Sequence, residues 1–250
     1  MNGKFGAAEL GIAMEIGERL LICGAEVSRV EDTITRICRA YGARRVDVFT
    51  ITSSIVVSAW GEGDIPVTQT RRVNGLATDL HALSELNDLS RRICETRPTG
   101  SEVTKALEKI DARPKYGFKS MLFIWLMVSA AFSVFFGGSW RDAAASAVIG
   151  VILKLLQAGL GRLKVPSLLS TLICSVVGGM GAYAAVYMHI ADNASSISIG
   201  NIMLLIPGIA LTNSIRDMFS GDTISGLLRF TEALILSIFI AWGFAIPAMF

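Results

Sequence analysis

Charged residues are scarce in this chain. Asp, Glu, Lys and Arg make up 18% of its 250 residues, whereas soluble domains contain about 25%. The scarcity belongs to one half, because residues 1–118 hold 16 basic and 16 acidic side chains and residues 119–250 hold only 7 and 5. We therefore predict a soluble domain over 1–118 and a membrane domain over 119–250.

Cysteine, histidine and net charge are also low, and each excludes a class of protein. The four cysteines show no CxxC spacing and there are two histidines, so we predict free thiols, no disulfide framework, no metal site and no cofactor. A net charge of +2 predicts no nucleic-acid partner. The chain has no Gly-rich phosphate loop, HExxH or GxSxG, so we do not expect an enzyme.

The first half alternates between helical and strand patterns. Apolar residues from Ile16 to Tyr41 recur in steps of three and four, which predicts one long helix. VDVFTITSSIVVSAW (46–60), the GEGD turn (61–64) and IPVTQTRRV predict a small antiparallel sheet, and two more helices follow. Glu9, Glu15 and Glu18 interrupt any signal-peptide core, so the amino terminus is expected in the cytoplasm.

The second half consists of long apolar runs. They predict membrane spans at about 119–140, 142–161, 167–189, 197–215 and 224–247, each near the ~20 residues that a bilayer requires. Basic residues near the helix ends favour the cytoplasmic side, and an odd number of spans places the carboxyl terminus outside. Small residues around Gly178 and Gly181 predict close helix packing in the third span.

The fourth apolar run is interrupted. Pro207 lacks an N–H, so the helix is expected to kink or to divide into two half-helices there. A packing kink and a solute site are equally compatible with the pattern. The polar residues that flank the break favour a site, because discontinuous membrane helices bind carboxylates and ions; they are Asn201, Thr212, Asn213 and Ser214.

Few charges lie within the spans, and each has two interpretations. Lys154 either extends toward the cytoplasmic surface or faces an anionic solute. Arg229 and Glu232 are expected to pair with each other, and a proton-relay role for Glu232, Asp217 or Asp222 is a weaker hypothesis. Glu26, Arg29 and Glu31 are either a solvated helix face or a docking surface.

Two stretches together resemble the threonine/serine exporter family: LLICGAEVSRVEDTITRI (20–37) and IPGIALTNSIRDMFSGDTISGLLRFTEALI (206–235). The resemblance implies an α-helical polytopic membrane protein with five transmembrane helices and an amino-terminal α+β cytoplasmic domain. Long members continue into a second, smaller membrane domain, whereas this chain ends at Phe250. It therefore looks like the split form, in which a separate small membrane subunit completes a transporter, as in two-subunit succinate exporters.

The resemblance and the span pattern together supply the candidate site. The residues expected to bind substrate are Lys154, Asn201, Pro207, Gly208, Thr212, Asn213, Arg216, Asp217 and Asp222. Those expected to gate or couple transport are Glu26, Arg29, Glu31, Asp32, Arg229 and Glu232, and Gly24 and Gly221 complete the two motifs.

The predicted function is secondary export of a small carboxylate solute, succinate-like or threonine/serine, across the bacterial inner membrane. We expect an oligomer embedded in the lipid bilayer, with its amino terminus cytoplasmic and its carboxyl terminus periplasmic. The alternatives are a membrane-anchored enzyme whose catalytic domain is cytoplasmic, and a regulatory subunit of a transporter.

Overall fold

A computed structural model describes residues 5–75, 77–114 and 116–249. The chain divides into two compact units. We call the first the mixed unit, which comprises Met1–Arg113 and Ile209–Thr231. The second, which we call the helical unit, comprises Pro114–Gly208 and Glu232–Phe250. The mixed unit thus includes a segment from the second half of the sequence.

The mixed unit begins with two helices and a sheet. Helices α1 (Ala7–Ile22) and α2 (Val27–Ala40) precede strands β1 (Arg45–Ile51), β2 (Ser54–Trp60) and β3 (Val67–Arg72). The strands form an antiparallel sheet in the order β1-β2-β3, in which Val57 lies opposite Val48 on one side and Gln69 on the other. The predicted small antiparallel sheet is confirmed.

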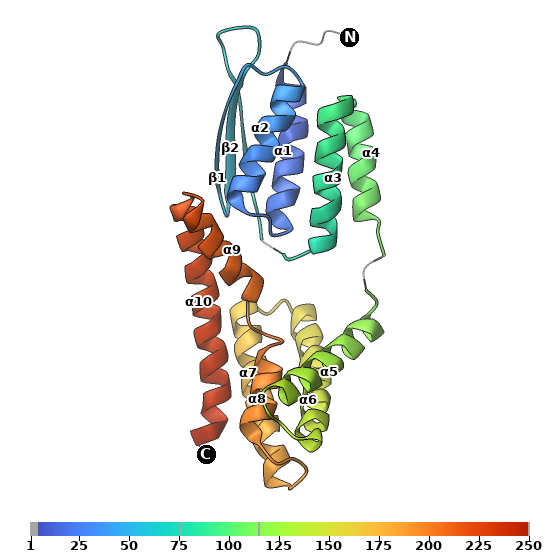
Figure 1. Cartoon of the computed structure of the whole chain (residues 1–250), viewed down its shortest axis with the longest axis vertical. Helices are drawn as coiled ribbons and strands as arrows, with labels where there is room; N and C mark the ends of the chain where they lie inside the picture. The colour runs from blue at the N-terminus through green and yellow to red at the C-terminus, as the bar shows by residue number, and fades with distance from the viewer. Residues whose placement is uncertain (1–4, 76, 115, 250) are drawn as a thin grey trace. The chain divides into compact units, whose positions relative to one another are not determined.

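The core of the mixed unit follows from strand alternation. Every second residue of β2 is buried, namely Ile55, Val57 and Ala59, as the period of two in a strand requires. This face belongs to one apolar core with α1 and α2, and helices α3 (Leu80–Thr96) and α4 (Gly100–Asp111) contact the α1–α2 pair. In Figure 1 the sheet, the α1–α2 pair and the α3–α4 pair follow one another as layers.

The prediction of one helix over 16–41 is wrong, although its apolar face is right. The chain turns between α1 and α2, where Gly24 takes a φ of +92° that glycine adopts readily. Glu26 occupies the N-cap position of α2. The turn keeps Ile16, Leu20 and the apolar residues of α2 on the core side, so periodicity alone did not reveal it.

The helical unit contains α5 (Phe118–Phe135), α6 (Trp140–Arg162), α7 (Ser167–Tyr187) and α8 (Ala194–Ile202). It also contains most of α10 (Thr223–Ala245) and the 3-10 helix Ile246–Met249. The predicted packing role of the small residues in α7 is supported, because a Cβ on Gly178 would lie 2.8 Å from the Phe244 ring.

Four helical segments in the described part of the chain are long and apolar enough to cross a membrane: α5, α6, α7 and Thr223–Met249. Many of their large apolar side chains are exposed, including Phe123, Met127, Ile152 and Leu155. Apolar exposure on this scale is typical of surfaces that face lipid. The structure is therefore that of a mostly helical, polytopic membrane protein.

The fourth predicted span is not one helix. It consists of α8, with nine residues, and α9 (Gly208–Phe219), with twelve, and residues 203–207 between them are not helical. The predicted division at Pro207 is confirmed. The break follows from the missing proline N–H and from the clash of its ring with the preceding turn.

Candidate functional site

Asp217 connects α9 with the start of α2. Its side chain is fully buried, and its Oδ1 accepts a hydrogen bond of 3.0 Å from the backbone N–H of Val27, the first residue of α2. The first N–H groups of a helix have no partner within the helix and carry partial positive charge. The Asp217 carboxylate therefore caps α2 from a segment 190 residues away in sequence.

Arg229, near the start of α10, neutralises Asp217. Its Nη1 lies 3.2 Å from Asp217 Oδ2, and its Nη1 and Nη2 lie 3.4 and 3.3 Å from the carbonyl oxygen of Ala25. Only 4% of Arg229 is exposed. Because an unpaired buried charge is costly, the pair and the α1–α2 turn hold one another in place.

The polar face of α9 makes two further contacts with the same turn. Asn213 Nδ2 donates to the carbonyl oxygen of Gly24 at 2.9 Å, and Arg216 forms an ion pair with Glu26. We call this set the clamp: Gly24, Ala25, Glu26, Val27, Asn213, Arg216, Asp217 and Arg229.

A second attachment lies beside the clamp. Ser225 Oγ, in the first turn of α10, donates to the carbonyl oxygen of Thr50 at 3.1 Å, and Thr50 N–H donates to Glu31 Oε1 at 2.8 Å. Burial raises the pKa of Glu31, and the nearby Asp222 carboxylate raises it further, whereas the hydrogen bonds from Thr50 lower it. Burial also raises the pKa of Asp222. Two carboxyl groups with raised pKa values, Glu31 and Asp222, therefore lie near each other beside the clamp.

Some predicted pairings and positions differ from the structure. Arg229 pairs with Asp217, and Glu232 is exposed, so the predicted Arg229–Glu232 pair is wrong. The reason is that Asp217 is fully buried and needs a cation, and Arg229 lies beside it, whereas Glu232 is exposed. Pro207 is half-buried, and Gly208 and Thr212 are exposed at the start of α9.

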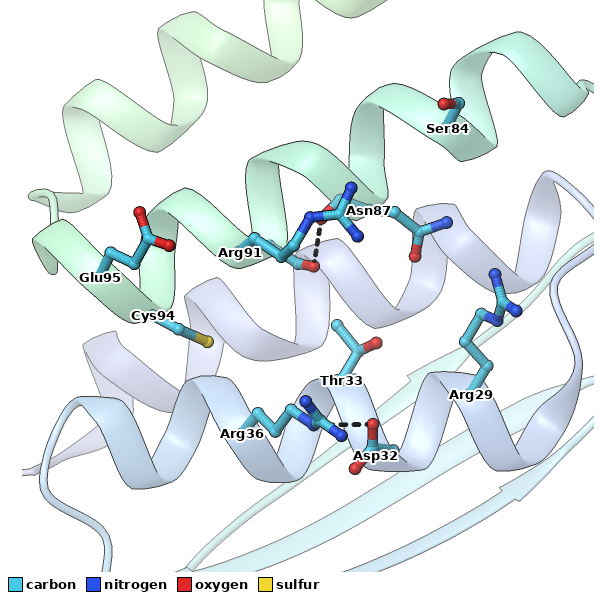
Figure 2. Close-up of a pocket in the computed structure, with 10 residues that line it drawn as sticks. Arg29, Asp32, Thr33, Arg36, Ser84, Asn87, Arg91, Cys94 and Glu95 are labelled. Atoms are coloured by element: carbon cyan, nitrogen blue, oxygen red, sulfur yellow. Dashed lines mark hydrogen bonds and ion pairs between the residues drawn. The ribbon is translucent and has the colours of Figure 1, made fainter.

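Two gating candidates line a cavity instead of joining the clamp. Arg29 and Asp32 lie on the side of α2 that faces α3, and Asp32 pairs with Arg36 at 2.8 Å. Figure 2 shows this cavity between the two helices.

Asn201 belongs to a polar seam within the helical unit. Its Nδ2 donates to Ser146 Oγ at 3.1 Å and to the carbonyl oxygen of Ile197 at 3.0 Å, and Ser146 Oγ donates to the carbonyl oxygen of Ser129 at 3.0 Å. Asn201 Oδ1 and Ser133 Oγ find no partner among the described atoms. We define the polar seam as Ser129, Ser133, Ser146 and Asn201, all fully buried.

Glycines bring the three helices of the seam into contact. A Cβ on Gly200 would lie 2.6 Å from the Ser129 carbonyl oxygen, and one on Gly150 would lie 2.5 Å from Ser129 Oγ. Helices α5, α6 and α8 therefore approach closely, as small residues allow within membranes. Asn201 Oδ1, which has no partner among the described atoms, can accept a hydrogen bond from a bound solute.

Lys154 lies elsewhere on α6. Its Nζ lies 3.0 Å from Gln157 Oε1 and 4.9 Å from the centre of the Trp125 ring, a cation–π distance. It lies eight residues from Ser146, about 12 Å along the helix. The structure therefore does not bring Lys154 and Asn201 into direct contact. Gln157 and Trp125 hold the ammonium group within the helical unit.

Asp142 is the other buried carboxylate of the helical unit. It is 1% exposed, and it accepts hydrogen bonds from the backbone N–H groups of Ser139, Asp192 and Asn193 at 2.8 to 2.9 Å. These bonds cap α6 and fasten the loop before α8. We assign it a structural role.

Several functional groups in and beside the two sets were not predicted from the sequence. Ser129, Ser133 and Ser146 were not predicted, although two serines four residues apart in an apolar run indicate one polar helix face. Ala25 and Val27 contribute backbone groups to the clamp, and Thr50 contributes backbone groups to the attachment beside it. No side-chain pattern reveals such backbone groups.

The fold and these buried polar contacts are those of a mostly helical, polytopic membrane protein. The threonine/serine exporter family matches residues 11–250, and the chain belongs to that family. This confirms the resemblance carried by the two sequence motifs.

Several relatives carry names that describe transport. The threonine/serine exporter of Corynebacterium glutamicum is 26% identical over 92% of this chain and 49% of its own length. A Mycobacterium tuberculosis protein named "Probable threonine/serine exporter" is 25% identical over 95% of this chain and 45% of its own. A Klebsiella aerogenes protein named "Probable succinate transporter subunit YjjP" is 25% identical over 88% of this chain and 84% of its own.

The chain therefore spans about half the length of the first two relatives. No solved structure matches the chain.

Proposed function

We propose that this chain is a subunit of a secondary exporter that moves a small carboxylate-bearing metabolite out of a bacterial cytoplasm. The observation that carries the proposal is the family match over residues 11–250. Relatives are named for threonine and serine or for succinate, and all of these solutes carry a carboxylate. The membrane potential or a proton gradient supplies the driving force in this proposal.

A separate small membrane protein completes the transporter in our proposal. Support comes from coverage, because the chain matches 84% of a relative named as a subunit and about half of the longer exporters. The names of the relatives give two substrate classes for this proposal: hydroxy amino acids and succinate-like dicarboxylates.

We also propose a membrane arrangement in the bacterial inner membrane. Residues 1–118 form the cytoplasmic domain and residues 119–250 the membrane domain, which crosses the bilayer five times. In this proposal α8 and the non-helical residues 203–207 after it make the fourth crossing, and α9 packs against the cytoplasmic α1–α2 turn. The few basic residues at helix ends support a cytoplasmic amino terminus and a periplasmic carboxyl terminus.

The two polar sets take different roles in this proposal. The seam and Lys154 serve the solute. Asn201 Oδ1 accepts a hydrogen bond from a donor group of the solute, such as the ammonium or hydroxyl group of threonine or serine, and Lys154 offers positive charge to its carboxylate. The remaining substrate candidates lie around the break at Pro207, on α9 and, for Asp222, just after it. Three of them, Asn213, Arg216 and Asp217, belong to the clamp.

The clamp acts as the cytoplasmic gate. It holds the α1–α2 turn against α9 and the start of α10, and α10 continues from the mixed unit into the helical unit as one helix. Release of the clamp frees the start of that helix. Glu31, Asp32 and Glu232 are coupling candidates in this model.

Proteoliposomes that contain both subunits test the proposal. Vesicles loaded with labelled succinate or threonine are expected to release one of them when a gradient is imposed. Lys154→Gln is expected to slow release strongly, while Lys164→Gln, an exposed lysine just after α6, retains it. Retention of every tested carboxylate by the wild-type vesicles would contradict the proposal.

A further inference from the structure

A cavity in the mixed unit lies apart from both polar sets. It has a volume of about 510 Å³, within the range of small-molecule sites, and it opens between α2 and α3. Its lining residues are Arg29, Asp32, Thr33, Arg36, Ser84, Asn87, Ser90, Arg91, Cys94 and Glu95. Polar side chains therefore dominate the lining, which indicates a polar ligand.

Only one of the three arginines in this lining lacks a carboxylate partner among the described residues. Arg36 pairs with Asp32, and Arg91 pairs with Asp88. Arg29 makes no ion pair within the part of the chain that the structure describes. Its guanidinium therefore has its fork of donors available for an anion.

Uncharged polar groups accompany Arg29. In Figure 2 the side chains of Arg29 and Thr33 extend from α2 toward α3, and the Asn87 amide extends from α3 toward Arg29. An arginine fork beside an amide and a hydroxyl matches the oxygens of a carboxylate, which accept several hydrogen bonds in one plane.

We propose that this cavity is a second, regulatory binding site for a small carboxylate, whose carboxylate group is held by Arg29 and Asn87. The ligand class follows from the cavity's own side chains. Glu95 lies in the same lining, so the site also accommodates a ligand that carries an ammonium group.

The cavity is placed to influence the clamp, a step that rests on the proposed function. Arg29 lies two residues after Val27, whose N–H binds Asp217, so ligand and clamp act on the same first turn of α2. A ligand that draws α2 toward α3 alters the position of that N–H. The site then senses the cytoplasmic concentration of a carboxylate and adjusts the gate.

Binding to the full chain in detergent or nanodiscs tests the site without transport. Calorimetry with succinate, threonine and inorganic phosphate compares the wild type with Arg29→Gln. Because Arg29 is exposed, we expect an affinity of about millimolar for one of the carboxylates. Arg29→Gln is expected to weaken it about tenfold or more. Arg39→Gln, an exposed arginine in the last turn of α2, is the matched control and keeps the affinity.

Alkylation of Cys94 gives a second readout. This thiol lines the cavity and is half-buried, and burial raises its pKa, so labelling is followed above pH 8. Saturating carboxylate is expected to slow labelling of Cys94 in the wild type and not in Arg29→Gln. Cys23, outside the cavity lining and also half-buried, serves as the internal reference.

Three results would overturn the site: equal affinity in Arg29→Gln, unchanged Cys94 labelling at saturating carboxylate, or phosphate binding as tightly as both carboxylates. The outcome is separable from that of the export assay. If vesicles fail to export but Arg29-dependent binding persists, only the exporter assignment fails. If export succeeds without binding, only the regulatory site fails.

Discussion

The clamp and the polar seam both bury polar groups, but they use different chemistry. In the mixed unit, Asp217 and Arg229 are buried as charges, and the carboxylate is further supported by a helix N-terminus. In the helical unit, the seam consists of hydroxyls and one amide. Asp217, Arg229 and all four seam residues are buried, so burial alone does not explain the choice.

The difference reflects what each set must hold. Loss of one member of the buried Asp217–Arg229 pair leaves an uncompensated buried charge. The pair in turn binds backbone groups of the α1–α2 turn, which is distant in sequence. Neutral hydroxyls are cheaper to leave partly unsatisfied in an apolar helix bundle. The clamp is therefore expected to respond sharply to mutation, and the seam to tolerate it.

The largest expected effect comes from Arg229→Leu. It leaves the Asp217 carboxylate buried without a cation, so we expect the free energy of unfolding to fall by about 3–5 kcal/mol. Denaturant unfolding of the full chain in detergent measures it. The double variant Asp217→Asn with Arg229→Leu should recover part of the loss. If Arg229→Leu alone lowers the free energy of unfolding by less than about 1 kcal/mol, the clamp is no more sensitive to mutation than the seam, and the contrast is wrong.

Gly200→Ala tests whether the seam depends on close packing. The added Cβ would lie 2.6 Å from the Ser129 carbonyl oxygen, a backbone atom that cannot move aside alone. We expect a loss of about 1–3 kcal/mol, measured by thermal unfolding in detergent. Gly208→Ala is the control, because a Cβ there meets no atom within 4 Å among the described residues beyond its chain neighbours and its own helix backbone. It should leave stability unchanged.

Asn201→Leu separates stability from transport. The substitution removes two donated hydrogen bonds but also removes the unpartnered Oδ1, so we expect a stability change of about 1 kcal/mol or less. Export in proteoliposomes is nevertheless expected to fall at least severalfold. Normal export by a stable Asn201→Leu protein would assign the seam to packing only.

The smallest effect concerns pH and Glu31. Its pKa is raised in the folded protein, so the folded state holds the proton more tightly than the unfolded state. The resulting stabilisation is present below its ordinary pKa of about 4.5 and is lost as the pH rises through the raised value. Glu31→Gln should therefore flatten the decline in melting temperature from pH 4.5 upward. An unchanged pH profile would show that Glu31 does not contribute.

The sequence predicted much of the architecture from periodicity and composition. The sheet, α5, α6 and α7, and the division at Pro207 all lie where patterns place them, because each depends on local residue order. The α1–α2 turn was not predicted, because Gly24 interrupts the helix without changing the periodic pattern of apolar residues. The pairing of Arg229 with Asp217 was not predicted, because the two residues lie twelve positions apart on different helices and do not follow the i,i+3 or i,i+4 spacing of one helix.

The sequence by itself determined which segments are apolar, where the proline divides a helix and which family the chain resembles. Local chemistry suffices for these, because hydrophobicity, the missing N–H and the motif residues act over a few positions. Only the tertiary structure decided that α9 caps α2 through Asp217, that Arg229 neutralises it and that Arg29 faces a cavity. Those contacts join segments up to 190 residues apart, and burial in three dimensions selects the partners.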